Sequence, residues 1–227
     1  MIGRKQEVKK LESALSANKS SFIAVTGRRR VGKTFLIDSI LREHYCFSLT
    51  GIQNADKASQ LFNFSVKLSE YMESENPVQF NDWQKAFYQL RTYLKTISTK
   101  KKQVIFIDEL PWVSTARSGF IQLLAHLWND YLSKEKHFIL VICGSATSWI
   151  SQKILNDTGG LHNRVSEIIH LKPFTLHETK LFLESQKLRF TDQQIAKIYM
   201  ALGGIPFYLE QIKKNITVYM LSILFIK

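Results

Sequence analysis

The stretch VTGRRRVGKTFLI, residues 25–37, contains the spacing that decides the fold of this chain. Gly27 is followed by four residues and then by Gly32, Lys33 and Thr34, so the segment fits G-x-x-x-x-G-K-[ST] without deviation. An apolar run precedes the pattern and a helix-length segment follows it, which is the setting in which such a loop binds phosphate. The sequence therefore predicts a phosphate-binding loop.

The loop residues are expected to contact a nucleotide in different ways. Lys33 is expected to pair with the β- and γ-phosphates, and Thr34 to offer its hydroxyl to Mg²⁺. Backbone amides in loops of this kind point at phosphate oxygens. The predicted nucleotide-binding segment is Gly27, Arg28, Arg29, Arg30, Val31, Gly32, Lys33, Thr34 and Phe35. The alternative is a basic turn without a ligand.

A second apolar run, VIFIDEL at 104–110, ends in two acids. A buried parallel strand that ends in Asp108 places this carboxylate at the carboxyl edge of the sheet, where α/β proteins bind ligands. Asp108 is expected to hold Mg²⁺ together with Thr34, and Glu109 to polarise the attacking water. An adjacent acid favours hydrolysis over transfer to another acceptor. The alternative is an acid pair that stabilises a helix N-terminus.

A third apolar run, CGSATSW at 143–149, ends in small polar residues. The hydroxyl of Ser145 is a candidate to bind the γ-phosphate or the attacking water. Ser145 or Thr147 can equally cap the next helix. The residues alone leave both interpretations open.

Apolar strand-like runs alternate with helix-length segments up to about residue 172, which predicts an α/β fold with a parallel sheet. Beyond Pro173 the pattern is helical only, with capping boxes at 175–178 and 191–194. We expect a core of residues 1–172 and a helical lid of residues 173–227, with an apolar tail from about 216. The expected strands are 21–26, 45–50, 103–108, 137–144 and 165–171, and helices are expected over 33–44, in two segments within 56–98, and over 119–132.

The 227 residues carry 31 Lys and Arg against 19 Asp and Glu, and residues 1–103 hold 18 of these cations against 9 anions. Such a surface suits polyanions such as a nucleotide, a nucleic acid or an acidic lipid surface. No apolar stretch reaches the roughly 18–20 residues that span a bilayer. Cys46 and Cys143 each lie in an apolar run, which predicts core packing in a cytoplasmic protein.

Five segments resemble one family when they are taken in order. Together they are similar to the prokaryotic AAA+ ATPases of the archaeal and bacterial STAND-related group, from Ile2 to about Lys214. The resemblance implies a three-layer P-loop NTPase sandwich with a five-stranded parallel sheet in the order 5-1-4-3-2 and a helical lid. It also implies ATP with Mg²⁺ as ligand, ATP hydrolysis, and Ser145 as a sensor of the γ-phosphate. The segments are GRRRVGKT (27–34), FIDELPW (106–112), CGSATSWI (143–150), GGLHNRVSEIIHLKPFTLHE (159–178) and GGIPFYL (203–209).

The same resemblance gives roles to two further residues. Arg164 matches a motif arginine that reaches the γ-phosphate of a neighbouring subunit; an arginine paired with Asp157 or Glu167 is the alternative. Pro206 matches a lid motif that packs against the nucleotide, although a glycine C-cap before a proline-started helix explains the same letters. The opening segment, residues 2–15, resembles the family's box near the adenine.

Three arginines occupy variable positions of the phosphate loop. Side chains at these positions point mostly outward while the backbone binds phosphate. Arg28, Arg29 and Arg30 are therefore expected to rim the site, raise the local anion concentration and meet a neighbouring subunit or a nucleic acid. Lys33 then makes the main phosphate contact.

Family members generally continue past the lid with a winged-helix-like region and a nuclease-like domain. Residues 216–227, ITVYMLSILFIK, do not resemble that continuation. The two expectations are a truncated or frameshifted product and a tail that folds onto the lid.

The sequence favours a Mg-dependent ATPase whose hydrolysis drives a conformational switch. The alternatives are a nucleic-acid-binding protein gated by nucleotide and a truncated nucleotide-binding remnant without effector output. The candidate partners are ATP or ADP, DNA and further copies of the chain, and the sequence identifies no effector partner. The predicted catalytic residues are Glu109, Lys33, Ser145 and Arg164, and the predicted metal ligands are Thr34 and Asp108.

Overall fold

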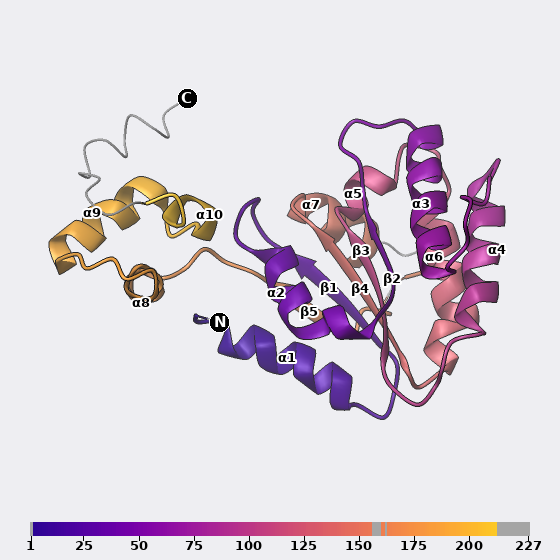
Figure 1. Ribbon diagram of the computed structural model, residues 1–227, viewed down its shortest axis with the longest axis horizontal. Helices are drawn as coiled ribbons and strands as arrows, with labels where there is room; N and C mark the ends of the chain where they lie inside the picture. The colour runs from indigo at the N-terminus through magenta and orange to yellow at the C-terminus, as the bar shows by residue number, and fades with distance from the viewer. Residues whose placement is uncertain (1, 156–159, 162, 213–227) are drawn as a thin grey trace.

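The computed structural model describes residues 2–155, 160–161 and 163–212, and a five-stranded sheet forms its centre (Figure 1). All neighbouring strands are parallel, in the order β2-β3-β4-β1-β5. This is the predicted order 5-1-4-3-2 read from the other edge, so the predicted fold is confirmed. The strands are β1 (Ser21–Thr26), β2 (Tyr45–Thr50), β3 (Gln103–Asp108), β4 (Phe138–Gly144) and β5 (Glu167–His170).

The strand boundaries follow the sequence pattern, and they differ only in β4 and β5. β4 begins one residue later than expected, and β5 loses two residues at its start and one at its end. β5 is an edge strand whose pairing with β1 extends only from Ile23 to Thr26. Because β5 pairs with one strand only, its length depends on the extent of that pairing. The pattern of apolar residues in the sequence does not indicate this extent.

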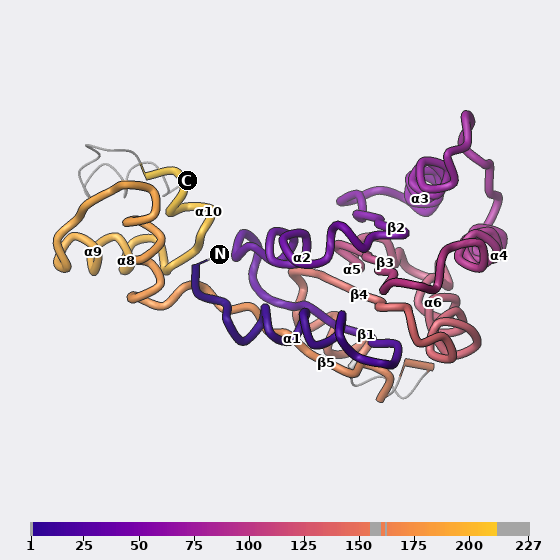
Figure 2. Tube along the Cα trace, turned by 60° about the horizontal axis from the view of Figure 1, so that its bottom comes forward, coloured from indigo at the N-terminus to yellow at the C-terminus, as the bar shows by residue number. Residues whose placement is uncertain are grey.

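Helices cover both faces of the sheet (Figures 1 and 2). One face carries α1 (Lys5–Ser16) and α2 (Lys33–Leu41), and the other carries α3 (Lys57–Tyr71), α4 (Trp83–Leu94) and α6 (Phe120–Asp130). Short elements connect them: η1 (Arg42–His44), α5 (Leu110–Val113), η2 (Leu132–Lys134), α7 (Thr147–Ile150) and the π-helix η3 (Ser151–Leu155).

Alternation along β1 divides the core into two layers. Ile23 and Val25 belong to the hydrophobic cluster on the α1 and α2 face, whereas Phe22 and Ala24 belong to the cluster on the α3, α4 and α6 face. Successive side chains of a strand point to opposite faces, so a fully apolar strand is buried on both. All six residues of β1 are buried. Packing on both faces therefore holds in place the strand that leads into the phosphate loop.

The helical segment after residue 172 has its own hydrophobic cluster, which includes Phe174, Ile198 and Leu209. Its helices are α8 (Leu176–Ser185), α9 (Asp192–Leu202) and α10 (Pro206–Leu209), and both expected capping boxes are formed. This separate cluster supports the division into a core of residues 1–172 and a lid of residues 173–227, which we retain as a proposal. The tail from 216 lies outside the described residues.

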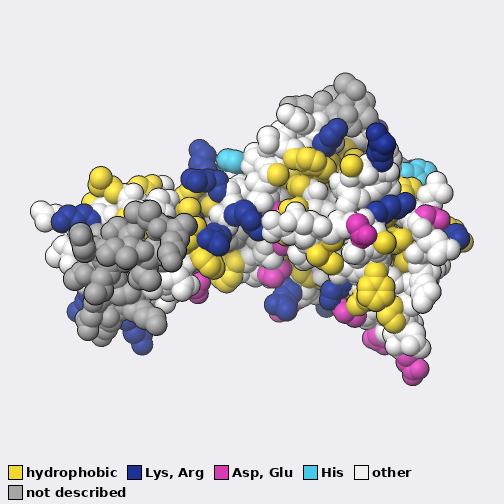
Figure 3. All heavy atoms as spheres, turned by 90° about the horizontal axis from the view of Figure 1, so that it is seen from above, with side chains coloured by type: hydrophobic (Ala, Val, Ile, Leu, Met, Phe, Trp, Pro, Cys, Tyr) yellow, Lys and Arg dark blue, Asp and Glu magenta, His cyan; other side chains and the backbone are white. Residues whose placement is uncertain are grey.

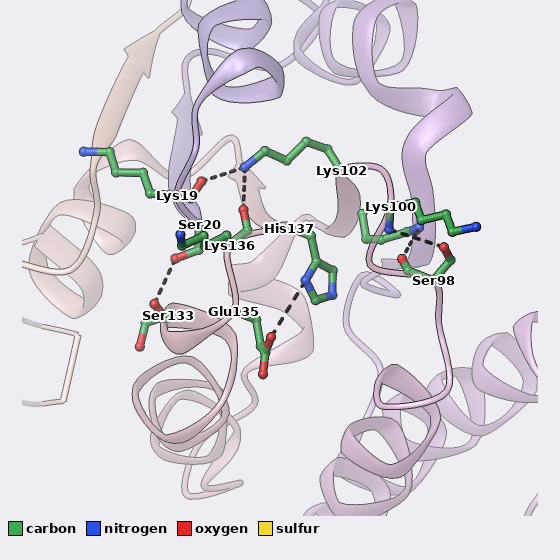
Figure 4. A network of polar contacts seen from close by, with 10 residues as sticks. Lys19, Ser20, Ser98, Lys100, Lys102, Ser133, Glu135, Lys136 and His137 are labelled. Carbon is green, nitrogen blue, oxygen red and sulfur yellow. Dashed lines mark hydrogen bonds and ion pairs between the residues drawn. The ribbon is translucent and has the colours of Figure 1, made fainter.

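The amino edge of the sheet is fastened by Lys102 (Figure 4). Its ammonium donates to the carbonyls of Lys19, at 2.6 Å, and Lys136, at 2.7 Å, so it joins the segments that enter β1, β3 and β4. Lys102 is half-buried and has this structural role, while its neighbours Lys100 and Lys101 are exposed.

Candidate nucleotide-binding site

The predicted phosphate loop leaves the carboxyl end of β1 and turns into α2. Gly27 has a φ of 147°, and a Cβ placed there would lie 2.3 Å from the carbonyl oxygen of Leu171, so the position excludes any side chain. Gly32 has open space around it but a left-handed φ of 89°, which glycine adopts at little cost. The two glycines thus serve different purposes. Gly27 allows the close approach of Leu171, and Gly32 allows the chain to turn into α2.

Lys33 is buried at the centre of the loop, with 6% of its surface exposed. Its ammonium donates to the carbonyls of Gly27 and Arg28, each at 3.0 Å. An ammonium has three donors, and both of these acceptors are neutral carbonyls. These two bonds therefore hold the loop curled around the ammonium of Lys33.

Thr34 and Asp108 meet across the edge of the sheet. Thr34 Oγ1 donates to Asp108 Oδ2 at 2.8 Å, and Asp108 Oδ1 accepts from the amide of Glu109 at 2.9 Å. Asp108 ends β3 and is 6% exposed. A hydroxyl and a carboxylate form a set of hard oxygen donors, which is the chemistry that Mg²⁺ prefers.

Glu109 lies beside Asp108 and is held by the end of β4. Both the amide and the hydroxyl of Ser145 donate to Glu109 Oε2, each at 3.2 Å. Ala146 is the N-cap of α7 and no side chain bonds to that helix end, so the capping alternative for Ser145 and Thr147 is wrong. Glu109 also borders a cavity of about 310 Å³ that the phosphate loop encloses.

A second cavity, of about 470 Å³, lies between the phosphate loop, the N-terminal segment and the lid. Pro206, which the resemblance placed against the nucleotide, is among the residues that line it. Its walls are mainly apolar, which suits the flat face of a base. The two cavities share Arg30, Gly32 and Phe35, so one elongated ligand can occupy both. The other lining residues are Ile2, Arg4, Val31, Leu36, Phe174, Phe182, Gln186, Phe207 and Glu210.

Arg4 joins the N-terminal segment to both walls of this second cavity. Its guanidinium stacks over Phe174 at 4.8 Å and donates to the carbonyl of Val31 at 3.5 Å. Burial lowers the pKa of Arg4, and Glu7 and Glu178 oppose that shift. Apart from Pro206, the lid residues that line this cavity, such as Phe174, were not found from the sequence, because no motif reports how the lid folds back on the loop.

The three loop arginines are exposed, and two of them, Arg29 and Arg30, contact different parts of the molecule. Arg29 donates to the side chain of Gln53 at 3.3 Å and stacks over Trp112 at 5.3 Å, whereas Arg30 reaches the lid. Figure 3 shows Lys and Arg side chains gathered where the lid meets the core. The loop arginines therefore form a cationic rim, in which Arg29 contacts Gln53 and Trp112 and Arg30 contacts the lid.

Arg164 is not brought to this site within its own chain. It precedes β5, and the amide of Ser166 donates to the carbonyl of Phe22 at the start of β1. The phosphate loop begins after Thr26, about 13 Å away at ~3.3 Å per strand residue. Of the alternative partners, Glu167 pairs with Lys10 at 2.6 Å, and Asp157 lies outside the described residues.

Neither cysteine lines the two cavities, although Cys143 lies at the end of β4 beside Asp108. Both are buried and unpaired by disulfide, which confirms the expected core packing. Burial raises the pKa of Cys46 to about 12 and raises that of Cys143 as well. Both thiols are therefore protonated at neutral pH and chemically quiet.

The comparisons with known proteins agree with this geometry. The model of a family described as an ATPase domain predominantly from Archaea matches residues 1–212. The chain belongs to this archaeal ATPase family. The family assignment confirms the predicted P-loop ATPase resemblance and supports nucleotide binding by this domain.

Two curated relatives of this archaeal ATPase domain come from Methanocaldococcus jannaschii. An uncharacterized protein is 28% identical over 215 residues, which cover 93% of this chain and 44% of the relative. An uncharacterized ATP-binding protein is 30% identical over 148 residues, which cover 63% of this chain and 38% of the relative. The chain thus spans less than half the length of either relative.

Solved structures share the fold of this archaeal ATPase domain. A Walker-type ATPase of Pyrococcus abyssi has a TM-score of 0.64 at 17% identity, covering 92% of this chain and 65% of that one. A STAND protein of Pyrococcus horikoshii with a tetratricopeptide repeat sensor has a TM-score of 0.54 at 19% identity, covering 97% and 31%. The Drosophila ORC bound to DNA has a TM-score of 0.66 at 13% identity, covering 98% of this chain and 60% of that one.

None of the helices in the described residues has the length and apolar character of a membrane span.

Proposed function

We propose that this ATPase domain binds ATP with Mg²⁺ between the core and the lid and hydrolyses its γ-phosphate. The observation that carries the proposal is the convergence of Lys33, Thr34, Asp108 and Glu109 at one edge of the sheet. The phosphates occupy the smaller cavity, beside Lys33. The base occupies the larger, apolar cavity, and the shared wall of the two cavities accommodates the ribose.

The oxygen donors of Thr34 and Asp108 fit Mg²⁺, since they lie 2.8 Å apart and belong to a hydroxyl and a carboxylate. In the described residues, no group of three or more His, Cys, Asp or Glu offers an alternative metal site. Mg²⁺ commonly needs only one or two protein ligands, because phosphates and waters complete its shell. Bound there, it would neutralise charge on the β- and γ-phosphates.

Glu109 is the proposed base, and Ser145 is proposed to position it. The Glu109 carboxylate accepts a proton from the attacking water, while Lys33 stabilises charge on the phosphates. Both donors of Ser145 now bind Glu109 Oε2. A γ-phosphate oxygen offers the Ser145 hydroxyl a second acceptor, so phosphate occupancy and the freedom of Glu109 are linked.

A conformational switch follows from where the ligand would lie. Residues of both the loop and the lid line the larger cavity, among them Val31, Phe174 and Pro206. A nucleotide bound there contacts both units. Loss of the γ-phosphate then changes the contacts made on one side of the junction and not on the other, which is the differential interaction that a switch requires.

Steady-state ATP hydrolysis with Mg²⁺ tests the proposal. Lys33→Ala should abolish nucleotide binding, because it removes both the loop's internal bonds and the phosphate's cation. Glu109→Gln should retain binding and lower turnover by about 100-fold or more, as expected for loss of a general base. Wild-type turnover by Glu109→Gln would rule out Glu109 as the base. ATP binding without turnover in the wild type would favour the nucleotide-binding remnant.

Arg164 is proposed to act on a neighbouring copy. It lies near the amino ends of the strands, whereas the phosphate loop of its own chain follows their carboxyl ends. Lys33→Ala and Arg164→Ala chains should each be inactive alone. A mixture should recover part of the activity, since the Lys33→Ala chain can supply Arg164 to the intact loop of its neighbour. Full activity of Arg164→Ala alone would remove this role.

DNA binding gated by nucleotide is the second candidate. The cationic excess of residues 1–103 and the exposed rim arginines favour it, and one solved structure of the same fold is an ORC bound to DNA. Duplex DNA affinity should then fall steeply between about 50 and 200 mM salt and depend on ATP. No binding at the lower salt concentration would eliminate this function and leave the ATPase proposal intact.

A further inference from the structure

Arg30 connects the phosphate loop to the lid through four contacts. Its guanidinium lies 4.6 Å from the ring centre of Phe207 and 5.3 Å from that of Tyr208. Its Nη1 donates to the Tyr208 hydroxyl at 2.7 Å, and its carbonyl accepts from the amide of Phe207 at 3.4 Å. Arg30 and Tyr208 are 178 residues apart in the sequence, and these contacts hold α10 against the loop (Figure 1).

Arg30 also lies at the boundary between the two cavities. It lines the larger cavity together with Pro206 and Phe207, and it lines the smaller one together with Lys33. Tyr208, by contrast, is not among the residues that line either cavity. A change at Tyr208 that affects the nucleotide therefore acts through its contacts, and one of these is the hydrogen bond from the guanidinium of Arg30.

The orientation of these contacts separates two roles for the Arg30 side chain. A guanidinium that binds phosphate directly would point its donors into the smaller cavity. Here the planar group stacks on an aromatic ring and gives a donor to a phenol of the lid, which is the geometry of a cation–π and charged hydrogen-bond clamp. The Arg30 side chain thus faces the lid.

We propose that Arg30 is a positioning residue that clamps α10 over the larger cavity, the base cavity of the proposed function, and thereby sets how long the nucleotide is retained. The inference rests on the proposed nucleotide function and adds a role for the lid contact of the loop. The clamp acts on ligands that use the base cavity. A ligand that occupies the phosphate cavity alone does not sense it.

The test compares ATP with inorganic tripolyphosphate as probes on the full chain, with dissociation constants measured by calorimetry. Arg30→Ala should weaken ATP and ADP binding by about tenfold, as a cation–π pair and a charged hydrogen bond are lost. Tyr208→Phe keeps the ring and removes the hydroxyl, so it should weaken ATP binding by about threefold. Tripolyphosphate affinity should change less than about twofold in both variants.

Arg189→Ala is the matched control, because it removes an exposed arginine of the lid outside the cavities. The KM for ATP should rise in Arg30→Ala in step with the loss of ATP affinity, and it should stay close to wild type in Arg189→Ala. An equal loss of tripolyphosphate and ATP affinity would show that Arg30 binds phosphate directly and overturn the clamp. Unchanged ATP affinity in Arg30→Ala would overturn it too. If the wild type itself binds no ATP, the proposed function fails, and the clamp fails with it.

Discussion

Ser145 donates two hydrogen bonds, one from its amide and one from its hydroxyl, to the same carboxylate oxygen of Glu109, each 3.2 Å long. Glu109 itself has a left-handed backbone, with φ of 46° and ψ of 50°. Both its backbone and its side chain are thus held in one arrangement. The end of β4 therefore restrains the side chain that we propose as the base.

Replacement of Ser145 by alanine tests this restraint. The amide bond to Glu109 remains and the hydroxyl bond is lost, so the carboxylate is held less firmly in its catalytic position. ATP turnover at saturation should fall by about tenfold, while the dissociation constant of ATP changes less than about twofold. Ser145→Thr restores a hydroxyl and should recover most of the turnover. A Ser145→Ala enzyme with full turnover would show that the hydroxyl has no positioning role.

Thr34→Val tests the metal site without relying on turnover. Valine has a similar shape to threonine and lacks the hydroxyl, so it removes one oxygen donor and the bond to Asp108. In the wild type, Mg²⁺ should tighten ATP binding. Thr34→Val should lose most of that gain, while its affinity for ATP in the presence of EDTA stays close to wild type.

The control for this prediction is Ser39→Ala, which removes a hydroxyl from the exposed side of the same helix. It should keep the response to Mg²⁺. A full Mg²⁺ response in Thr34→Val would place the metal elsewhere.

Lys102 gives a prediction about stability. Lys102→Ala removes both bonds that join the entries of β1, β3 and β4 (Figure 4). The two carbonyls lie near the surface and regain water, so the cost should be about 1–3 kcal/mol in the free energy of unfolding. Lys101→Ala, at the exposed neighbouring position, should cost less than about 0.5 kcal/mol. Denaturant unfolding followed by circular dichroism measures both.

His137 predicts how stability depends on pH. Burial lowers the pKa of His137 below its usual 6.5, Glu135 opposes the shift, and the charge of Lys102 adds to it. The unfolded chain therefore binds a proton that the folded chain resists. Stability from this group is complete above about pH 6.5 and is lost as the pH falls below that value, by less than about 1.4 kcal/mol per pH unit.

His137→Asn should flatten this part of the stability curve between about pH 7 and 5. His126→Asn removes an exposed histidine from α6 and is the matched control. Unfolding free energies at several pH values decide the point. A curve for His137→Asn that is as steep as that of the wild type would show that other groups cause the decline.

The sheet and its carboxyl edge were predictable because their signals are local. The glycine spacing at 27–34 marks a loop between strand and helix, and the apolar run before Asp108 marks a buried strand. Parallel strands bring such ends to one edge, so the meeting of Thr34 with Asp108 follows from the fold class. The roles assigned to the site residues remain predictions.

The lid contacts were not predictable, since they depend on how two packed units meet. Arg30 and Tyr208 are 178 residues apart, and nothing near either residue reports the other. Lys102 was hidden for a similar reason, because its acceptors are backbone carbonyls of distant segments. A sequence motif singles out Arg164. The sequence alone did not show that Arg164 lies near the amino ends of the strands, while its own phosphate loop follows their carboxyl ends.

The close approach of Gly27 to Leu171 places a pivot beside the phosphate loop. The amide of Leu171 bonds to the carbonyl of Thr26, at 2.8 Å, and the chain then leaves the sheet toward the lid. The start of the loop and the root of the lid therefore rest on the same point of β1. If the proposed switch tilts the loop, we expect the lid to turn about this point and to carry α9, a helix about 16 Å long, with it.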